Sequence, residues 1–335
     1  MAQVSILGAG SWGLALATVL LDNQHQVNIW EFDHAAAARL AQLREEPDKL
    51  PGIKMPSSVS ITSDLNEAVA NAEYLLLAVP AQVMRSVAQQ VAATGCSAGA
   101  LVLLAKGIEV RSQKRMSEVI IEVLGQESGA RVCSVSGPSH AEEVARFQPT
   151  SVVAAGSDLQ TVEAVQQLLS TGSFRVYSSN DLIGVELGGA LKNIIAVAAG
   201  ILHGLELGDN TMGALLTRGL AEISRLGCSL GAQAETFAGL SGLGDLVTTA
   251  ASRHSRNRYV GERIGRGEKL AEILKSMKMV AEGVETTRAA VKLAERCDVE
   301  MPITEQVHEV LFNDKPPLEA ISDLMSRELK REVYS

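Results

Sequence analysis

Features that mark several common classes of protein are missing from this sequence. Its 335 residues include only four cysteines, which lie far apart and form no Cys-x-x-Cys pair. We therefore expect neither a disulfide framework nor a zinc site, and this cysteine usage fits a reducing cytoplasm. The six histidines have no His-Glu-x-x-His or other ligand spacing, so we assign no metal. A Gly-x-Ser-x-Gly nucleophile elbow is also absent.

The sequence has neither an excess of positive charge nor an apolar run of membrane-spanning length. Lysine and arginine number 30 against 39 aspartate and glutamate residues, a net charge of −9. No global basic field exists to hold nucleic acid or an anionic membrane, so any anionic ligand must meet local positive charge. The apolar run at residues 194–202 is about half of the roughly 20 residues that span a bilayer. No lysine or arginine precedes residues 4–21, as it would in a secretion signal. We predict a cytoplasmic protein without membrane insertion.

The chain has enough apolar residues to form two folded cores. Hydrophobic residues make up 46% of the chain, and its length is about twice that of a usual domain. Short apolar runs alternate with helical patterns in the first half, which indicates a parallel sheet with crossover helices. We predict an α/β fold, with a Rossmann-type doubly wound parallel sheet at residues 1–178 and an all-α domain at residues 179–335. The expected strands are residues 4–7, 27–30, 74–79, 101–105, 132–135, 151–155 and 174–177.

A glycine-rich loop, GAGSWG at residues 8–13, stands between the first strand and an apolar helix. In a dinucleotide-binding turn, Gly8 would make the tight turn, Gly10 would admit a pyrophosphate, and Gly13 would let helix and strand pack closely. The phosphates would bind free N–H groups at the helix N-terminus. Glu31 follows about 20 residues on, where an acid can bind the ribose hydroxyls. The alternative is a glycine turn with no ligand.

The residues after the second strand bear on the choice of cofactor. The Glu31 carboxylate would repel a 2′-phosphate, and only Arg39 supplies a cation between Glu31 and Leu43, so the sequence favours NAD over NADP. Phe32 is placed to pack on the adenine. Alternatively, Glu31 and Asp33 are a solvated strand end.

Polar residues follow two further strands, at the edge where open α/β sheets bind ligands. Lys106 follows the fourth expected strand and could meet an anion in a cleft, unless it is a solvated surface lysine. Gly137 and Ser139 follow the fifth. The spacing of Ser139 and Glu142 also matches a capping box.

Lys192 lies in a helical pattern at residues 184–207. Gly188 and Gly189 lie one turn away, so this helix face has room for a ligand beside a partly desolvated cation. Desolvation lowers a lysine pKa toward the range in which the side chain exchanges protons near neutrality. The alternative is a lysine that extends from a buried helix to water.

Two polar segments follow this helix. The glycine-rich segment 239–245 ends at Asp245, and the segment 252–258 reads Ser-Arg-His-Ser-Arg-Asn-Arg. Such a dense set of donors in an acidic protein suits a phosphate dianion. A solvent-exposed basic helix terminus is the rival interpretation. Because no base-stacking aromatic residues are interleaved, we do not expect nucleic-acid binding.

Several segments together match one known family. They are GAGSWGLALA at 8–17, AKGIE at 105–109, SGPSHAEE at 136–143, GVELGGALKNIIA at 184–196, TRGLAEISRLG at 217–227, GLSGLGDLVTT at 239–249, SRNR at 255–258, VAEGVETT at 280–287 and MPITE at 301–305. With these segments, the chain resembles the NAD(P)-dependent sn-glycerol-3-phosphate dehydrogenases of the bacterial cytoplasmic type, within the wider 6-phosphogluconate-dehydrogenase-like fold.

The resemblance implies reversible reduction of dihydroxyacetone phosphate to sn-glycerol 3-phosphate, which feeds glycerophospholipid synthesis. Lys192 would accept the proton in alcohol oxidation and donate it in ketone reduction, and nearby Asp245 would keep its ammonium form available. The implied substrate-binding residues are Lys106, Gly137, Ser139, Lys192, Asp245, Ser255, Arg256 and Asn257. With the glycine loop and Glu31, the cofactor-binding residues would be Gly8, Gly10, Ser11, Trp12, Gly13, Glu31, Phe32, Lys106, Ala141, Arg256, Val280 and Glu282. Asn193 and Thr249 are additional candidates.

Two other functions remain open at this point. A sister dehydrogenase of the same fold could act on a hydroxyacyl or hydroxy-acid substrate, and a non-catalytic module could sense the dinucleotide. The long apolar helices at residues 181–231 are compatible with a homodimer and equally with an intramolecular core.

The residue at position 32 generates a prediction about the cofactor. Many bacterial relatives carry histidine or arginine where this chain has Phe32, and residues 30–33 are more similar to the W-x-F-E of NAD-dependent eukaryotic enzymes. We expect turnover with NADH to equal or exceed turnover with NADPH in steady-state kinetics. A clear preference for NADPH would contradict this expectation.

Overall fold

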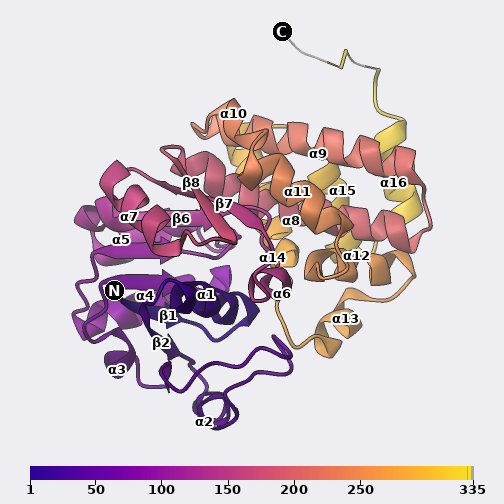
Figure 1. Ribbon diagram of the computed structural model, residues 1–335. Coiled ribbons are helices and arrows are strands. Elements are labelled where there is room, and N and C mark those ends of the chain that lie inside the picture. Colours follow the sequence, from indigo (N-terminus) through magenta and orange to yellow (C-terminus); the bar gives the residue numbers. More distant parts are fainter. Residues whose placement is uncertain (330, 333–335) are drawn as a thin grey trace.

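A sheet with helices on both faces lies beside a group of long helices in Figure 1. The computed structural model describes residues 1–329, 331 and 332. Residues 330 and 333–335 of the expected second domain lie outside the described residues. The sheet has eight strands in the order β3-β2-β1-β4-β5-β6-β7-β8. The strands are β1 (Gln3–Leu7), β2 (Gln26–Trp30), β3 (Ser60–Thr62), β4 (Tyr74–Leu77), β5 (Ala100–Leu103), β6 (Val132–Ser136), β7 (Thr150–Gly156) and β8 (Phe174–Ser179).

Successive strand residues face two different helical layers, because side chains alternate across a strand. Ile6 of β1 belongs to the core shared with α1 and α7, whereas Leu7 belongs to the core shared with α4 and α5. Both layers bury apolar side chains, which is why the strands read as continuous apolar runs. The helices of this half are α1 (Ser11–Asp22), α2 (His34–Leu43), α3 (Leu65–Val69), α4 (Met84–Thr94), α5 (Met116–Leu124), α6 (Ala141–Val144) and α7 (Leu159–Leu169).

The doubly wound sheet is confirmed, with two differences. The edge strand β3 was not expected, since three residues are too few to form an apolar run. The expected parallel direction is wrong for β7, which pairs antiparallel with β6, while β8 runs parallel to β7. A parallel return usually runs through a long crossover helix. The β6–β7 connection contains only the four-residue helix α6, so the chain turns back instead.

Helix α8 (Leu182–Gly204) is the centre of the second half, and every residue from 184 to 202 is buried. It begins after Asp181, whose carboxylate accepts a hydrogen bond from the Gly184 N–H at 2.9 Å. Among the described helices, α8 is the one long and apolar enough to cross a membrane, but 83% of its apolar window is buried inside the protein. The surrounding elements include α9 (Asp209–Ser229), α10 (Ala234–Phe237), α11 (Asp245–Ala251), α12 (Arg256–Gly265), α13 (Leu270–Ser276), α14 (Glu282–Cys297), α15 (Pro302–Phe312) and α16 (Pro317–Met325).

Glycines bring α8 and α12 into backbone contact. A Cβ atom added to Gly261 of α12 would lie 1.9 Å from the Val197 carbonyl oxygen, and one added to Gly200 of α8 would lie 2.0 Å from the Arg258 carbonyl oxygen. Neither helix can carry a side chain at the crossing. The first turn of α12 is therefore held directly against the helix that contains Lys192.

This crossing predicts that Gly261→Ala destabilises the fold by about 1–3 kcal/mol, the usual cost of overpacking a core. Urea unfolding followed by circular dichroism measures the change. Gly213→Ala on α9 is the matched control, because its Cβ would meet nothing within 4 Å. That control should be neutral or stabilising by up to about 1 kcal/mol, since alanine favours a helix over glycine. Equal effects of the two substitutions would contradict the close contact.

Candidate functional site

The glycine loop after β1 has the geometry of a dinucleotide-binding turn. Gly8 has φ +114°, and a Cβ there would lie 2.7 Å from the Ala78 carbonyl oxygen. A Cβ on Gly13 would lie 2.2 Å from the Gly8 carbonyl oxygen, so the loop and α1 are packed closely. Gly10 faces open space and precedes α1 without a side-chain cap. The first N–H groups of α1 therefore have no side-chain cap, as in helix starts that bind phosphate groups.

The two residues after Gly10 line this loop. The Ser11 hydroxyl donates to the Lys49 carbonyl oxygen at 2.7 Å and lies 3.2 Å from the Met279 sulfur atom. The Trp12 ring lies 6.4 Å from the ring of Phe174, and its buried indole N–H has no hydrogen-bond partner in the described structure. A donor buried without a partner leaves an interaction open for a ligand.

The interpretation of a solvated strand end after β2 is wrong for Glu31, although Asp33 is exposed. Glu31 is only 4% exposed, and its carboxylate lies 3.4 Å from the Lys49 ammonium group. Asp33 has a structural role, because it caps α2 by accepting a hydrogen bond from the Ala36 N–H at 2.8 Å. Phe32 is 78% exposed, as an adenine-packing side chain would be before the cofactor binds.

Lys106, Asp245 and Lys192 meet where the two halves of the chain face each other. One Asp245 oxygen lies 2.7 Å from the Lys106 ammonium group, and the other lies 3.1 Å from that of Lys192. The Lys192 ammonium group also donates to the Thr249 hydroxyl at 2.5 Å. Lys106 comes from the loop after β5, Lys192 from α8, and Asp245 from the start of α11.

The surroundings of Lys192 differ from the expected open helix face. A Cβ on Gly188 would lie 2.7 Å from the Ser241 carbonyl oxygen, and one on Gly189 would lie 2.3 Å from the Ser136 hydroxyl. The glycines therefore allow the segment before Asp245 to pack against α8. Lys192 does not extend to water, because its side chain is 6% exposed.

Burial decides the ionisation of this lysine. Desolvation lowers the pKa of Lys192 to about 8, which the charge of Asp245 offsets only in part, and the positive charges of Lys106 and Arg256 act in the same direction as burial. Burial also opposes ionisation of Asp245, but the two lysines outweigh it and lower the pKa of that carboxyl. Lys192 can therefore exchange a proton near neutral pH while Asp245 stays ionised.

The residues after β6 are arranged by hydrogen bonds to Lys106. Its ammonium group donates to the Gly137 carbonyl oxygen at 2.9 Å and lies 3.4 Å from the Ser139 hydroxyl. The capping-box interpretation of Ser139 is wrong. His140 is the residue that precedes α6, and the Ser139 hydroxyl donates to the Gly137 carbonyl oxygen instead, at 2.8 Å. Ala141 is the first residue of α6.

The first turn of α12 combines one free cation with buried polar groups. Ser255 caps the helix by accepting from the Arg258 N–H at 3.1 Å. Arg256 is exposed and forms no hydrogen bond or ion pair with any described residue. Asn257 is buried, donates to the Asn193 side chain at 2.7 Å and accepts from the Gly283 N–H at 2.9 Å. The segment is therefore only partly the exposed basic terminus of the rival interpretation.

Asn193 continues this network to the first half of the chain. Its amide group donates to the Lys106 carbonyl oxygen at 3.0 Å. Glu282 begins α14 and accepts from the Ala81 N–H at 2.9 Å, while its second carboxylate oxygen is buried without a partner in the described structure. Burial raises the pKa of Glu282. Val280, two residues before Glu282, is 48% exposed.

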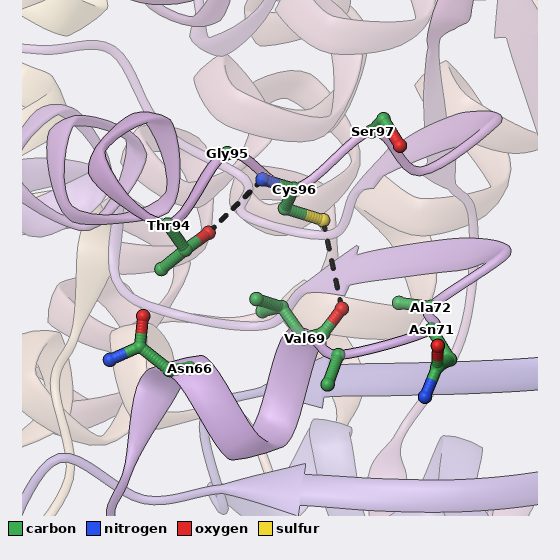
Figure 2. A pocket seen from close by; sticks show the side chains of 9 residues that line it. Asn66, Val69, Asn71, Ala72, Thr94, Gly95, Cys96 and Ser97 are labelled. Carbon is green, nitrogen blue, oxygen red and sulfur yellow. Dashed lines mark hydrogen bonds between the residues drawn. The ribbon is translucent and has the colours of Figure 1, made fainter.

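One hollow of the described structure lies away from these residues. It has a volume of about 260 Å³ and lies between the loops that precede β4 and β5 (Figure 2). Its lining includes Asn66, Thr94, Cys96 and Ser97. These loops are at the amino ends of the strands, whereas ligands of such sheets bind at the carboxyl ends. No group of three or more metal-ligating side chains occurs among the described residues.

A dinucleotide-binding sheet joined to a helical half with a buried, ionisable lysine defines a nicotinamide-dependent oxidoreductase. Models of the NAD-dependent glycerol-3-phosphate dehydrogenase N-terminus and C-terminus match residues 3–162 and 181–322. The chain belongs to the NAD-dependent glycerol-3-phosphate dehydrogenase family.

Named relatives and a solved structure agree with this family. A glycerol-3-phosphate dehydrogenase [NAD(P)+] of Chlorobium phaeobacteroides is 49% identical over 332 residues, which cover 99% of this chain and 100% of the relative. A relative of the same name from Geobacter sulfurreducens is 48% identical, with 99% of each chain covered. The crystal structure of glycerol-3-phosphate dehydrogenase from Coxiella burnetii is 35% identical and has a TM-score of 0.93, over 97% of this chain and 99% of that one.

Alanine substitutions at Gly10 and Gly8 should affect different properties, cofactor binding and fold stability. Gly10→Ala should leave the unfolding temperature within about 2 °C of the original and weaken NADH binding at least tenfold, because its Cβ would occupy only the space for the pyrophosphate. Gly8→Ala should destabilise the fold, because it combines a positive φ with a backbone clash. Thermal unfolding and NADH fluorescence titration measure the two effects. Unchanged NADH affinity in Gly10→Ala would place the pyrophosphate elsewhere.

Proposed function

We infer that this chain interconverts dihydroxyacetone phosphate and sn-glycerol 3-phosphate by hydride transfer with NAD or NADP. The observation that carries the inference is the buried Lys192, which shares Asp245 with Lys106 where the two halves meet. We propose that residues 1–178 hold the dinucleotide and that residues 179–335 complete the substrate site. The product would supply glycerophospholipid synthesis.

Lys192 is proposed to handle the proton of the substrate's C2 oxygen. A bound nicotinamide cofactor supplies or accepts the hydride at C2. In ketone reduction the Lys192 ammonium group gives its proton to the C2 oxygen, and in alcohol oxidation the neutral amine takes that proton back. Negative charge therefore never accumulates on a free alkoxide. Asp245 and Thr249 orient the amine, and Lys106 is placed to contact the substrate beside Gly137 and Ser139.

Arg256 is proposed to hold the substrate phosphate. It is exposed at the start of α12 and free of ion pairs with described residues, so its guanidinium can bind a dianion in a fork geometry. Its positive charge contributes to lowering the pKa of Lys192, which supports a position near the same anionic ligand. The buried Ser255 and Asn257 support this turn and leave their remaining hydrogen-bonding capacity for the substrate. Binding the phosphate away from C2 orients the reacting carbon.

The location and assembly of the protein are also proposals. All four cysteines are free, which supports a reducing cytoplasm. Burial of α8 among the other helices supports a role as core helix without membrane insertion. Because α8 is internal, a homodimer would have to use the outer helices of the second half, and it stays a prediction.

Loss of NADH absorbance with dihydroxyacetone phosphate tests the function, and the Lys192→Met variant tests the role of this lysine. We expect turnover to fall about 10²–10⁴-fold, the usual contribution of general acid catalysis, with NADH binding retained. In the original chain, ketone reduction should decline and alcohol oxidation should rise as the pH passes about 8, where Lys192 loses its proton.

Lys292→Met on the exposed face of α14 is the control and should change neither activity nor pH profile. A dinucleotide sensor would bind NADH without any turnover in the original chain. Retention of most activity in Lys192→Met would exclude this lysine as the proton donor.

A further inference from the structure

We propose that His140 is a positioning residue, which holds residues 248–255 of the second half against the first half. This segment comprises the end of α11 and the turn before α12. Thr249 in the segment accepts a hydrogen bond from Lys192, and Arg256 directly follows the segment. The inference rests on the proposed function, because it concerns how the proposed proton donor and the proposed phosphate ligand are held.

The imidazole ring of His140 contacts this segment at two places. It forms a hydrogen bond with the backbone of Thr248, and this bond raises the pKa of His140, as donation by a ring N–H to a carbonyl oxygen does. The centroid of the ring also lies 6.0 Å from that of the His254 ring, with 50° between the ring planes. This distance is favourable for aromatic rings. Because His140 directly precedes α6 in the first half, both contacts cross between the halves.

The contact with Thr248 acts on Lys192 through the next residue, Thr249. The Thr249 hydroxyl accepts from the Lys192 ammonium group and donates to the Asp245 carboxylate at 3.1 Å. Thr249 and Lys192 are 4% and 5% exposed, so water is kept away from the ammonium group. A shift of the end of α11 would admit water there. Burial is the largest cause of the low pKa of Lys192, so this shift would raise that pKa.

The contact with His254 acts on the proposed phosphate side of the site. His254 is exposed and lies two residues before Arg256, and its backbone N–H donates to the Ser252 hydroxyl at 3.1 Å. Ser255, between them, is the cap of α12. The ring contact therefore fixes the direction in which the chain enters α12, and with it the position from which the Arg256 side chain starts.

His140 can keep these contacts only as a neutral imidazole. Burial lowers its pKa, and the positive charge of Lys192 acts in the same direction. Glu142 and Glu143 on α6 and the hydrogen bond to Thr248 oppose this change only in part. The Nε2 atom is buried without a partner in the described structure, so a proton there would be a buried donor without an acceptor. The ring therefore stays neutral while Lys192 exchanges its proton.

Two substitutions separate the two contacts, and steady-state kinetics measure the result. His140→Phe keeps a ring beside His254 and loses the hydrogen bond to Thr248. The pH midpoint of sn-glycerol 3-phosphate oxidation, expected near 8 in the original chain, should rise by about 0.5–1 pH unit. The KM for dihydroxyacetone phosphate should change less than about threefold in this variant.

His140→Gln has the opposite expected result, because it keeps an amide donor for Thr248 and loses the ring. The KM for dihydroxyacetone phosphate should rise about five- to tenfold, with the pH midpoint unchanged. The affinity for NADH should stay within about twofold in both variants, since neither contact involves the glycine loop.

His203→Phe and His203→Gln are the matched controls, because His203 lies at the end of α8 and its side chain is 52% exposed. Neither should change the KM or the midpoint. Circular dichroism checks the folding of each variant, and if one His140 variant does not fold, the other decides. Unchanged values, or equal effects of the two His140 substitutions, would overturn the proposal. Absence of turnover in the original chain would instead refute the proposed function, and calorimetric binding of dihydroxyacetone phosphate would then still test the contact with His254.

Discussion

The site depends on a carboxylate that lies between two ammonium groups from opposite halves of the chain. Asp245 accepts from Lys106, which follows a strand of the sheet, and from Lys192, which lies on the central helix of the second half. Two cations so close together, one buried and one partly buried, would repel each other without this shared anion. The charge of Asp245 offsets the effect of burial on the Lys192 pKa only in part, because burial is the larger effect. One residue thus joins the two halves and keeps the lysine able to release a proton.

Further hydrogen bonds fix the position of the two halves relative to each other. Glu186, in the second turn of α8, accepts from the Arg115 guanidinium at 2.6 Å and from the Ser117 N–H at 2.8 Å, at the start of α5. Asn193 connects the same helix to the Lys106 backbone. These buried groups are satisfied only when both halves are folded and docked, so the separate halves would leave them without partners. The arrangement of the lysines is therefore a consequence of how α8 meets the sheet.

The parts of the site that could be predicted from the sequence are those set by local backbone geometry. The glycine loop and the strand, turn and helix around Gly8 and Gly13 follow from spacing, as does the position of Glu31. Long-range contacts do not leave such a pattern. Lys49 reaches Glu31 from a polar loop with no repeating feature, and Ser139 satisfies its hydroxyl through a neighbouring carbonyl instead of a helix end. The antiparallel direction of β7 depends on its connection to β6, whose helix α6 is too short for a crossover.

The backbone contact between α8 and α12 fixes the separation between Lys192 and Arg256. Lys192 lies on α8 and Arg256 begins α12, and no side chain separates the two helices at Gly200 and Gly261. Helices in such contact cannot slide past each other by even an ångström or two without a clash of backbone atoms. The separation between the proposed proton donor and the proposed phosphate ligand is then as constant as the crossing itself. With these proposed roles, a fixed separation would favour substrates by the length of the carbon chain between the reacting oxygen and the phosphate.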